Sequence, residues 1–271
     1  MVAGLRFTVN HFTDEILPPK LARLKPRAYN PVRFNMTYRL LSSLLVGSLL
    51  LATTVSQAAD KKKKAGKGKW ITLFDGKLHG KLRGYRTKEF PEKSWKIDGD
   101  ALTTIHKDKG GVREDLLTKA KFKDFELAWE WRATPAGNSG VMYRVKIDPK
   151  KPAYFTGPEY QMLDDDKHRD GGIDRRRAGC LYDLIEAEGK KLKAVGEWNT
   201  SRIVSKDNHF EHWLNGKKVL EFQWGSDEIK DLIKKSKFAK WPNFMTQQTG
   251  HIAFQHHGEE FSIRNLKIRR L

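Results

Sequence analysis

Short segments in which hydrophobic and polar residues alternate follow one another from Trp70 to the end of the chain. The clearest lies at residues 125–132, where hydrophobic side chains, two of them tryptophans, occupy every second position. A period of two predicts a β-strand with one face in a core and the other exposed. The sequences Asp98-Gly99 and Asn215-Gly216 lie between such segments and predict hairpin turns. Together these patterns predict an all-β fold, an antiparallel sandwich or jelly roll with one short helix.

The helix is expected at residues 226–239. Ser226 can cap its first turn, and Ile229, Leu232 and Ile233 form an apolar stripe at helical spacing. The other strands are expected at residues 70–74, 95–102 (as a hairpin), 139–145, 159–163, 198–205, 209–214, 218–222, 250–257 and 261–268, with a further buried strand beginning near Cys180.

Residues 156–164 combine a strand pattern with unusual polar chemistry. Gly157-Pro158 ends the preceding segment, because proline has a fixed φ and no N–H. Strict alternation then places Glu159 and Gln161 on one face of a strand and Tyr160 and Met162 on the other. A carboxylate beside an amide suits a sugar, whose hydroxyls both donate and accept hydrogen bonds. An ordinary half-exposed strand would show the same alternation.

The N-terminal segment has the order of an export signal. Arg39 precedes an apolar run at residues 40–52, and small residues follow it up to Ala59, so residues 36–59 are expected to be a secretory signal peptide. Residues 1–35 are expected to be a disordered or mis-assigned start, with Met36 as the true one. The protein is therefore expected to be secreted or periplasmic. An uncleaved membrane anchor is the less favoured alternative, since Lys61 to Lys64 oppose translocation.

Residues 60–69 are predicted to be a flexible Lys-rich linker and residues 70–271 a single domain. The formal net charge of +19 suggests nucleic acid as a partner, but the basic residues are dispersed and no nucleic-acid motif is present. Attraction of the linker to anionic surfaces is the interpretation retained, and no oligomeric state is predicted. The single cysteine, Cys180, excludes an intrachain disulfide and a cysteine-based zinc site.

Polar residues that alternate with core positions could gather on one concave sheet and form a saccharide groove, although each alone fits a solvated strand face. This set consists of Glu130, Arg132, Arg144, Glu159, Gln161, His212, Gln255 and His257, with Asn138 in the turn before a strand.

Several short motifs in a fixed order resemble the 3-keto-disaccharide hydrolase family, of the type found in secreted proteins of planctomycetes and Bacteroidetes. They are Trp70–Gly76 (WITLFDG), Asn138–Arg144 (NSGVMYR), Gly157–Asp164 (GPEYQMLD), Gly179–Asp183 (GCLYD), Glu197–Asn199 (EWN), His212–Gly216 (HWLNG) and Gln255–Gly258 (QHHG). The resemblance covers residues 70–271 and implies a concanavalin-like β-sandwich. His256 stands where the family usually has Asp.

The resemblance also implies a reaction. The C3 carbonyl of a 3-keto sugar acidifies the hydrogen at C2, so that a base can remove it; the C1 substituent then leaves, and water adds. Such chemistry needs a base, a group that polarises the carbonyl and an acid. The base is expected among Glu159, Glu130 and His257. Arg132 or Arg144 would stabilise the enolate oxygen, and His212 or His257 would protonate the leaving group, while Asn138, Gln161 and Gln255 would bind substrate.

Other interpretations stay open at this point. Glu130 and Glu159 could form the carboxylate pair of an ordinary glycosidase. His212, His256, His257 and Glu159 are ligand types for a divalent metal, although the adjacent His256 and His257 would point to opposite faces of a strand. A non-catalytic carbohydrate-binding module is the alternative function, because proteins of one fold can differ in activity. A protein that binds anionic polymers is a third.

Overall fold

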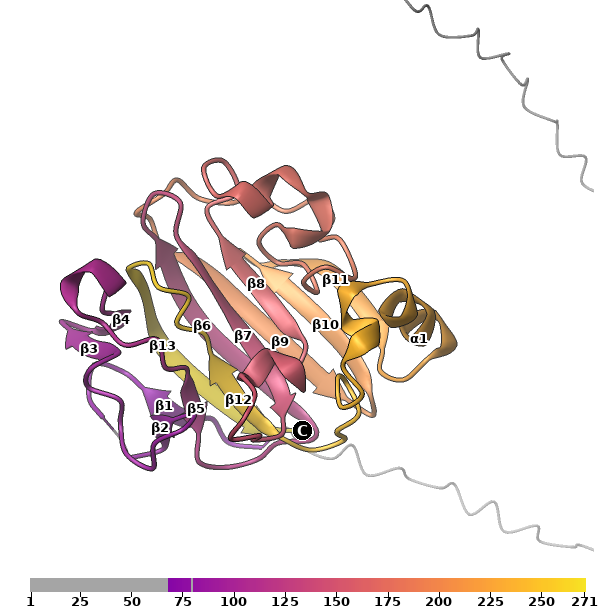
Figure 1. Cartoon of the computed structure of the whole chain (residues 1–271), viewed down its shortest axis with the longest axis horizontal. Coiled ribbons are helices and arrows are strands. Elements are labelled where there is room, and N and C mark those ends of the chain that lie inside the picture. Colours follow the sequence, from indigo (N-terminus) through magenta and orange to yellow (C-terminus); the bar gives the residue numbers. More distant parts are fainter. Residues whose placement is uncertain (1–67, 79) are drawn as a thin grey trace, which may run out of the picture. The chain divides into compact units, whose positions relative to one another are not determined.

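The alternating segment at residues 125–132 forms the central strand of a sheet, β6 (Phe125–Ala133). Its hydrophobic side chains are buried, and three of the four intervening ones, Ala128, Glu130 and Arg132, are partly exposed. The computed structural model describes residues 68–78 and 80–271 (Figure 1). The predictions made for residues 1–35, for the signal peptide at 36–59 and for residues 60–67 of the linker lie outside the described residues. At the other end of that linker, the Gly68 N–H donates to Arg270 O (3.0 Å).

Two antiparallel sheets form the sandwich, which confirms the predicted concanavalin-like class. The larger sheet has eight strands in the order β11 (Lys217–Gln223), β10 (His209–Leu214), β9 (Asn199–Lys206), β6, β13 (Phe261–Arg270), β4 (Ala101–Thr104) and β3 (Trp95–Asp98), with β1 (Ile71–Phe74) also paired to β13. The smaller has five, in the order β2 (Leu82–Gly84), β5 (Leu116–Thr118), β12 (His251–Phe254), β7 (Asn138–Val145) and β8 (Glu159–Leu163).

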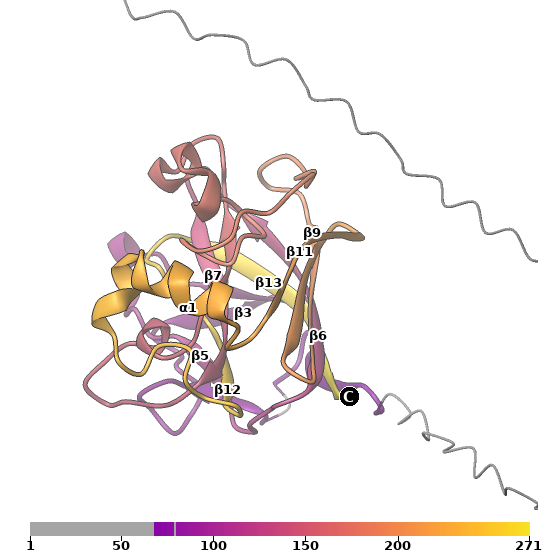
Figure 2. The same cartoon turned by 90° about the vertical axis from the view of Figure 1, so that its right-hand side faces the viewer.

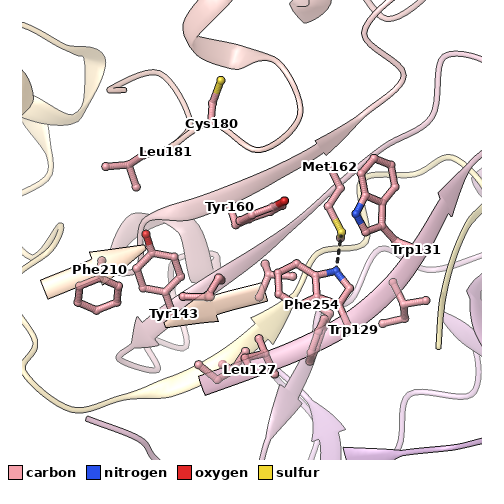
Figure 3. Close-up of a cluster of buried hydrophobic side chains, with 14 of the residues drawn as sticks. Leu127, Trp129, Trp131, Tyr143, Tyr160, Met162, Cys180, Leu181, Phe210 and Phe254 are labelled. Atoms are coloured by element: carbon pink, nitrogen blue, oxygen red, sulfur yellow. Dashed lines mark hydrogen bonds between the residues drawn. The ribbon is translucent and has the colours of Figure 1, made fainter. Parts of the chain in front are cut away.

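The core lies between the sheets and is rich in aromatic rings (Figure 3). Trp129 of β6 packs edge-on against Tyr160 of β8, with ring centroids 5.0 Å apart, and its indole N–H donates to the Met162 sulfur at 3.1 Å. The Trp131 indole N–H donates to Ser201 Oγ at 2.8 Å. Buried aromatic rings keep their polar atoms partnered in this way. The prediction that Tyr160 and Met162 face the core is therefore confirmed, and Glu159 and Gln161 face away from it.

The Asn215-Gly216 hairpin forms as predicted, with φ of 47° and 81° that match a type I′ turn between β10 and β11. The first hairpin differs slightly, because Asp98 pairs with Ala101 and the turn residues are Gly99 and Asp100.

The predicted alternation of β7 fails at its end. Arg144 has φ of 52°, and the pairing with β12 shifts between His251 and Ala253, so that β7 contains a bulge. A bulge adds a residue to one strand and reverses the facing of the residues after it. Arg144 therefore shares the side of Tyr143, and Val145 joins Met142 in the cluster on the opposite face.

The predicted helix is shorter than expected. Helix α1 (Asp227–Lys234) is capped by Ser226, whose Oγ accepts from the Ile229 N–H. It ends before Ser236, because the Ser236 hydroxyl donates to Ile233 O and accepts from the Phe238 N–H, which starts a 3-10 turn at Lys237–Lys240. Other 3-10 turns lie at Lys107–Lys109, Ala153–Phe155, Arg169–Gly172 and Asp174–Arg176.

The segment after Cys180 is not a strand, contrary to the prediction. Cys180 is buried, but Leu181 makes only isolated bridges to Tyr160 and Ile185, and Asp183 has φ of 60°. Short polar residues such as Asp tolerate the left-handed region and break strand pairing. Among the described residues, no helix is long and apolar enough to span a bilayer.

Candidate functional site

A cavity of about 620 Å³ lies on the face of the smaller sheet that points away from the core. Strands β7, β8 and the end of β12 supply its floor through Asn138, Glu159, Gln161 and Gln255. Figure 2 shows α1 on the opposite side of β7 from β6, and the 3-10 turn that follows α1 contributes Lys237 and Phe238 to the cavity wall. The core and the cavity therefore occupy opposite faces of one sheet.

Strand β8 places Glu159 and Gln161 in the cavity because their neighbours Tyr160 and Met162 are fixed in the core. On β7, Met142 pairs with Glu159 and Gly140 with Gln161. The Glu159 side chain lies across Gly140: a Cβ built on Gly140 would be 1.9 Å from Glu159 Oε1. Only glycine at position 140 leaves room for this placement of the carboxylate.

The amides of the floor have polar atoms without partners. Among the described residues, both side-chain polar atoms of Gln161 are buried and unpaired, as are Asn138 Oδ1 and Gln255 Oε1. Burying such groups without a hydrogen bond costs free energy, so native proteins rarely do it. Converging on one cavity, these amides suit a ligand that offers several donors and acceptors.

Glu159 is the most perturbed acid of the cavity. Its side chain has no hydrogen-bond donor within the described part of the chain, and the residue is 8% exposed. Burial raises the pKa of its carboxyl to about 8, while the positive charge of Lys237 acts in the opposite direction. A carboxyl that exchanges its proton near neutral pH is suited to proton transfer.

Lys237 is the cation that acts on the Glu159 carboxyl and lowers its pKa. Its Nζ lies 4.3 Å from the centroid of the Tyr182 ring and 3.8 Å from Asp183 Oδ2. Burial lowers the pKa of its ammonium group. Beside it, the Tyr182 hydroxyl donates to Asp170 Oδ2 at 2.9 Å, which fixes the ring.

Two further polar groups line the cavity near its floor. His257 Nδ1 is 2.8 Å from Glu259 Oε2, which orients the imidazole, and among the described residues its Nε2 has no partner. Asp115 accepts from the His256 N–H at 2.9 Å, and burial raises the pKa of its carboxyl to about 6. The cavity thus holds another perturbed carboxyl besides Glu159, and an oriented histidine.

Aromatic residues form the remaining wall: Tyr85, Tyr154, Phe238, Trp241 and Phe244. Trp241 stacks on Phe155, with centroids 4.2 Å apart, so its ring is fixed. An apolar wall opposite a polar floor is the usual design of a site for an amphipathic small molecule such as a sugar.

Five of the predicted site residues lie together in this cavity: Asn138, Glu159, Gln161, Gln255 and His257. Glu130 and Arg132 do not. Both are on β6, in the other sheet, on the face away from the core. Glu130 accepts from Arg264 Nε (2.8 Å) and Asn265 Nδ2 (2.9 Å), and Arg132 stacks over Trp198. The expectation that all the polar faces share one sheet is therefore wrong, and so is the carboxylate pair of Glu130 with Glu159.

Arg144 and His212 are fully buried on the core side. The bulge in β7 brings the Arg144 guanidinium over the rings of Phe210 and Trp224, at 4.8 and 4.6 Å. His212 bonds to the Tyr143 hydroxyl (3.0 Å) and to Gly179 O (3.0 Å), and burial lowers its pKa to about 4. Neither lines the cavity, so the roles expected for them in enolate stabilisation and protonation do not fit their positions.

His212 does not fit the role of metal ligand considered for it, because both of its ring nitrogens form hydrogen bonds in the core. His256 is 2% exposed, and its Nε2 bonds to Ile105 O. Within residues 68–78 and 80–271, one group has the spacing of metal ligands, His209, Glu211 and Glu221. It lies on the β10–β11 hairpin, where Lys218 already pairs with Glu221 at 2.6 Å.

Sequence reasoning missed Lys237, Asp115, Asp170 and the rest of the aromatic wall. These residues lie mainly in loops and turns, where no periodicity reports which way a side chain points. A usable signal for Lys237 was present, since the predicted amphipathic helix had to cover some apolar surface, and its end carries Phe238 and Trp241.

Fold and cavity together define a concanavalin-like β-sandwich with a ligand site on its smaller sheet. The chain belongs to the family of 3-keto-alpha-glucoside-1,2-lyase-like domains, whose model matches residues 69–269. This confirms the resemblance found in the motifs.

Known proteins agree with this assignment. The chain is 34% identical over 227 residues to a 3-keto-disaccharide hydrolase of Bacteroides thetaiotaomicron, covering 74% of this chain and 78% of that protein. A crystal structure from Parabacteroides distasonis, described as a candidate glycosyl hydrolase, has a TM-score of 0.68 at 32% identity, over 75% of this chain and 94% of the other. A second from the same organism has a TM-score of 0.57 at 27% identity, over 75% and 100%.

Proposed function

We propose that the cavity is the active site of this glycoside-cleaving enzyme, and that its substrate is a 3-keto glycoside or disaccharide. The observation that carries the proposal is Glu159: a buried carboxyl with a raised pKa, held over Gly140 and surrounded by unpaired amides. Membership of the 3-keto-alpha-glucoside-1,2-lyase-like family and the named relative support this substrate class.

In the first step the Glu159 carboxylate takes the proton from C2 of the sugar. The C2–H bonding pair moves into a C2–C3 double bond, and the negative charge passes to the oxygen at C3. Lys237, the cavity cation that acts on the Glu159 carboxyl, is placed to stabilise that oxygen. Positive charge already positioned beside the atom where negative charge develops lowers such a barrier.

In the second step the enolate re-forms the carbonyl, a C1–C2 double bond appears, and the bond from C1 to the glycosidic oxygen breaks. The leaving oxygen receives a proton from His257, which Glu259 orients through Nδ1. Water then adds across the double bond, with its hydroxyl at C1 and a proton returned to C2, so that the sum of the steps is hydrolysis. Asn138, Gln161 and Gln255 hold the ring hydroxyls throughout.

The test is to incubate the purified protein with 3-keto-trehalose or a 3-keto-glucoside in deuterium oxide and to identify the products. We expect release of the leaving group and deuterium at C2 of the released 3-keto sugar, because elimination exchanges that hydrogen. Release without deuterium at C2 would indicate direct displacement and would contradict the elimination route. Binding without any release would favour a carbohydrate-binding module.

The proposed base predicts a pH profile. Glu159 must be ionised to accept a proton, and burial holds its pKa at about 8. We therefore expect kcat/KM to rise about tenfold per pH unit on the acidic side and to level off above about pH 8. A stopped assay of leaving-group release between pH 5 and 9.5 measures this limb.

Replacing Lys237 with methionine removes the cation that lowers the pKa of Glu159. The acidic limb of the kcat/KM profile should therefore move to higher pH. Lys240 is exposed and lies in the same 3-10 turn outside the cavity, and Lys240→Met should leave the limb unchanged. A limb near pH 4.5 in the unmodified protein would assign the base to a solvated carboxyl in place of Glu159.

A further inference from the structure

The arginines of this protein divide into two groups. Most have a fixed partner: Arg176, for example, bonds to Asp183 at 2.7 Å, and Arg264 bonds to Glu130 at 2.8 Å. In the described part of the chain, three arginines have a guanidinium with no hydrogen bond, ion pair or ring contact: Arg86, Arg113 and Arg169. All three line the cavity.

Arg86 and Arg113 form a pair at one end of it. Arg86 follows β2 and Arg113 precedes β5, and β2 pairs with β5 through Gly84 and Leu116. Burial raises the pKa values of Asp115 and Tyr154, and both guanidinium groups act on each of them in the opposite direction. The two cations therefore lie close enough together to act on the same groups.

The neighbouring carboxylates do not neutralise this pair by direct contact. Glu114 Oε1 accepts from the N–H groups of Arg86 and Thr87, at 2.9 and 2.8 Å, and from the Thr87 hydroxyl. Asp115 accepts the N–H of His256. One oxygen of each acid is bonded to backbone N–H groups, which fixes the loops, and neither acid forms an ion pair with Arg86 or Arg113. Both guanidinium groups are therefore free to bind an anion from outside.

The pair and the base come from different strands of the smaller sheet. Glu159 is on β8 and Asp115 adjoins β5, three strands away across β7 and β12. Three strand spacings correspond to about 14 Å between the backbones of these strands, so the cavity between their side chains has room for a sugar ring with a substituent. His257, the proposed acid for the leaving oxygen, lies between His256, whose N–H donates to Asp115, and Gly258, where an added Cβ would be 3.7 Å from Arg113 Cδ. A ring held between Glu159 and His257 would therefore have its leaving group on the side of the arginines.

We propose, on the basis of the proposed function above, that the preferred substrate carries an anionic group, such as a carboxylate, sulfate or phosphate, on its leaving group, and that Arg86 and Arg113 bind this anion. Guanidinium groups pair with such anions through two parallel N–H···O bonds. An exposed, unpaired arginine is ordinary, but two at the same end of a cavity, beside acids that bond elsewhere, form a site of matching charge.

The test compares 3-keto-glucosides with leaving groups of nearly the same shape: 4-hydroxybenzoate, 4-hydroxybenzenesulfonate and the neutral 4-hydroxybenzamide. We expect kcat/KM to be about tenfold higher for an acidic substrate than for the amide. In the Arg86→Gln/Arg113→Gln protein the ratio should fall to near one. High salt should narrow the ratio in the unmodified protein, since salt screens exposed charges.

The matched control is Lys119→Gln/Lys121→Gln, which removes two exposed charges outside the cavity and should keep the preference. Equal kcat/KM for acid and amide in the unmodified protein would overturn the proposal, and so would a preference that survives in the arginine variant.

Failure of the proposed function is detected separately. If no 3-keto-glucoside is cleaved, calorimetry with the unoxidised glucosides of 4-hydroxybenzoate and 4-hydroxybenzamide still measures the anion site. Tighter binding of the acid, abolished in the arginine variant, would support the site without the reaction. Equal binding of the two would overturn it.

Discussion

Replacing Glu159 with glutamine is expected to lower kcat for cleavage of a 3-keto-glucoside by about 10²- to 10⁴-fold, the range that a positioned general base contributes. Glutamine has nearly the same shape and no basicity, and the carboxyl it replaces has no hydrogen-bond donor among the described residues. Turnover should therefore be lost while substrate still binds. Stopped-flow or product release gives kcat, and calorimetry gives Kd for an unreactive glucoside.

The same substitution is expected to stabilise the fold at alkaline pH. The folded-state pKa of Glu159, about 8, is above the ordinary glutamate value of 4.5, so the folded protein holds this proton more tightly than the unfolded chain. The contribution of this protonated carboxyl to the free energy of unfolding is fully present below about pH 4.5 and is lost as pH rises through 8. Glutamine avoids that loss, so its advantage should grow to a few kcal/mol at pH 9 and vanish near pH 4.

Thermal melts of the two proteins from pH 4 to pH 9 measure this difference. A variant with reduced turnover and unchanged stability at pH 9 would mean that the carboxylate is solvated in the folded protein. Unchanged turnover would remove Glu159 from the mechanism. The expected combination, an inactive and more stable protein, is typical of a residue kept for function at the expense of the fold.

Gly140→Ala is the second substitution with a large expected effect. The added Cβ would lie 1.9 Å from Glu159 Oε1 and 2.5 Å from its Cδ, so the carboxylate must move. A displacement of about 1 Å at a reacting group can cost about 10²-fold in rate. The backbone of Gly140 is not in the left-handed region, so alanine suits it and the protein should fold.

Gly172→Ala is the control, because a Cβ there meets nothing within 4 Å and the backbone is again compatible with alanine. It should leave kcat/KM unchanged. The double variant Gly140→Ala/Glu159→Gln gives the sharper result. If Gly140 acts only by placing the carboxylate, alanine should cost nothing further once the base is gone. A full additional loss in the double variant would mean that Gly140 has another role.

How far the sequence predicts this site is clear from β8 and β6. Alternation correctly separated Glu159 and Gln161 from Tyr160 and Met162, because a period of two decides which face of a strand is polar. In the same way, alternation correctly placed Glu130 and Arg132 on the face of β6 that points away from the core. It does not tell which sheet of a sandwich a strand joins, so polar faces on opposite sides of the molecule looked alike.

Local geometry explains the other misses. One left-handed residue, Arg144, reversed the facing of the end of β7, and no residue type in NSGVMYR signals a bulge at arginine. Lys237 and Asp115 are brought into the same cavity as Glu159 by tertiary packing of turns and loops. Such contacts depend on the whole chain, which a pattern read along a strand does not contain.

The irregular segment after Gly179 also has a consequence for the behaviour of the protein at high concentration. Strand β8 is the last of its sheet, and an open edge strand can pair with another molecule and begin aggregation. Here the free edge is already used: Gln161 N donates to Cys180 O, Gly179 N to Gln161 O, and Tyr182 N to Glu159 O. The segment after Gly179 pairs with β8 only through an isolated bridge and does not continue as a strand. It therefore does not itself present a flat strand edge to another molecule. The strand that carries the proposed base is thus protected from intermolecular pairing.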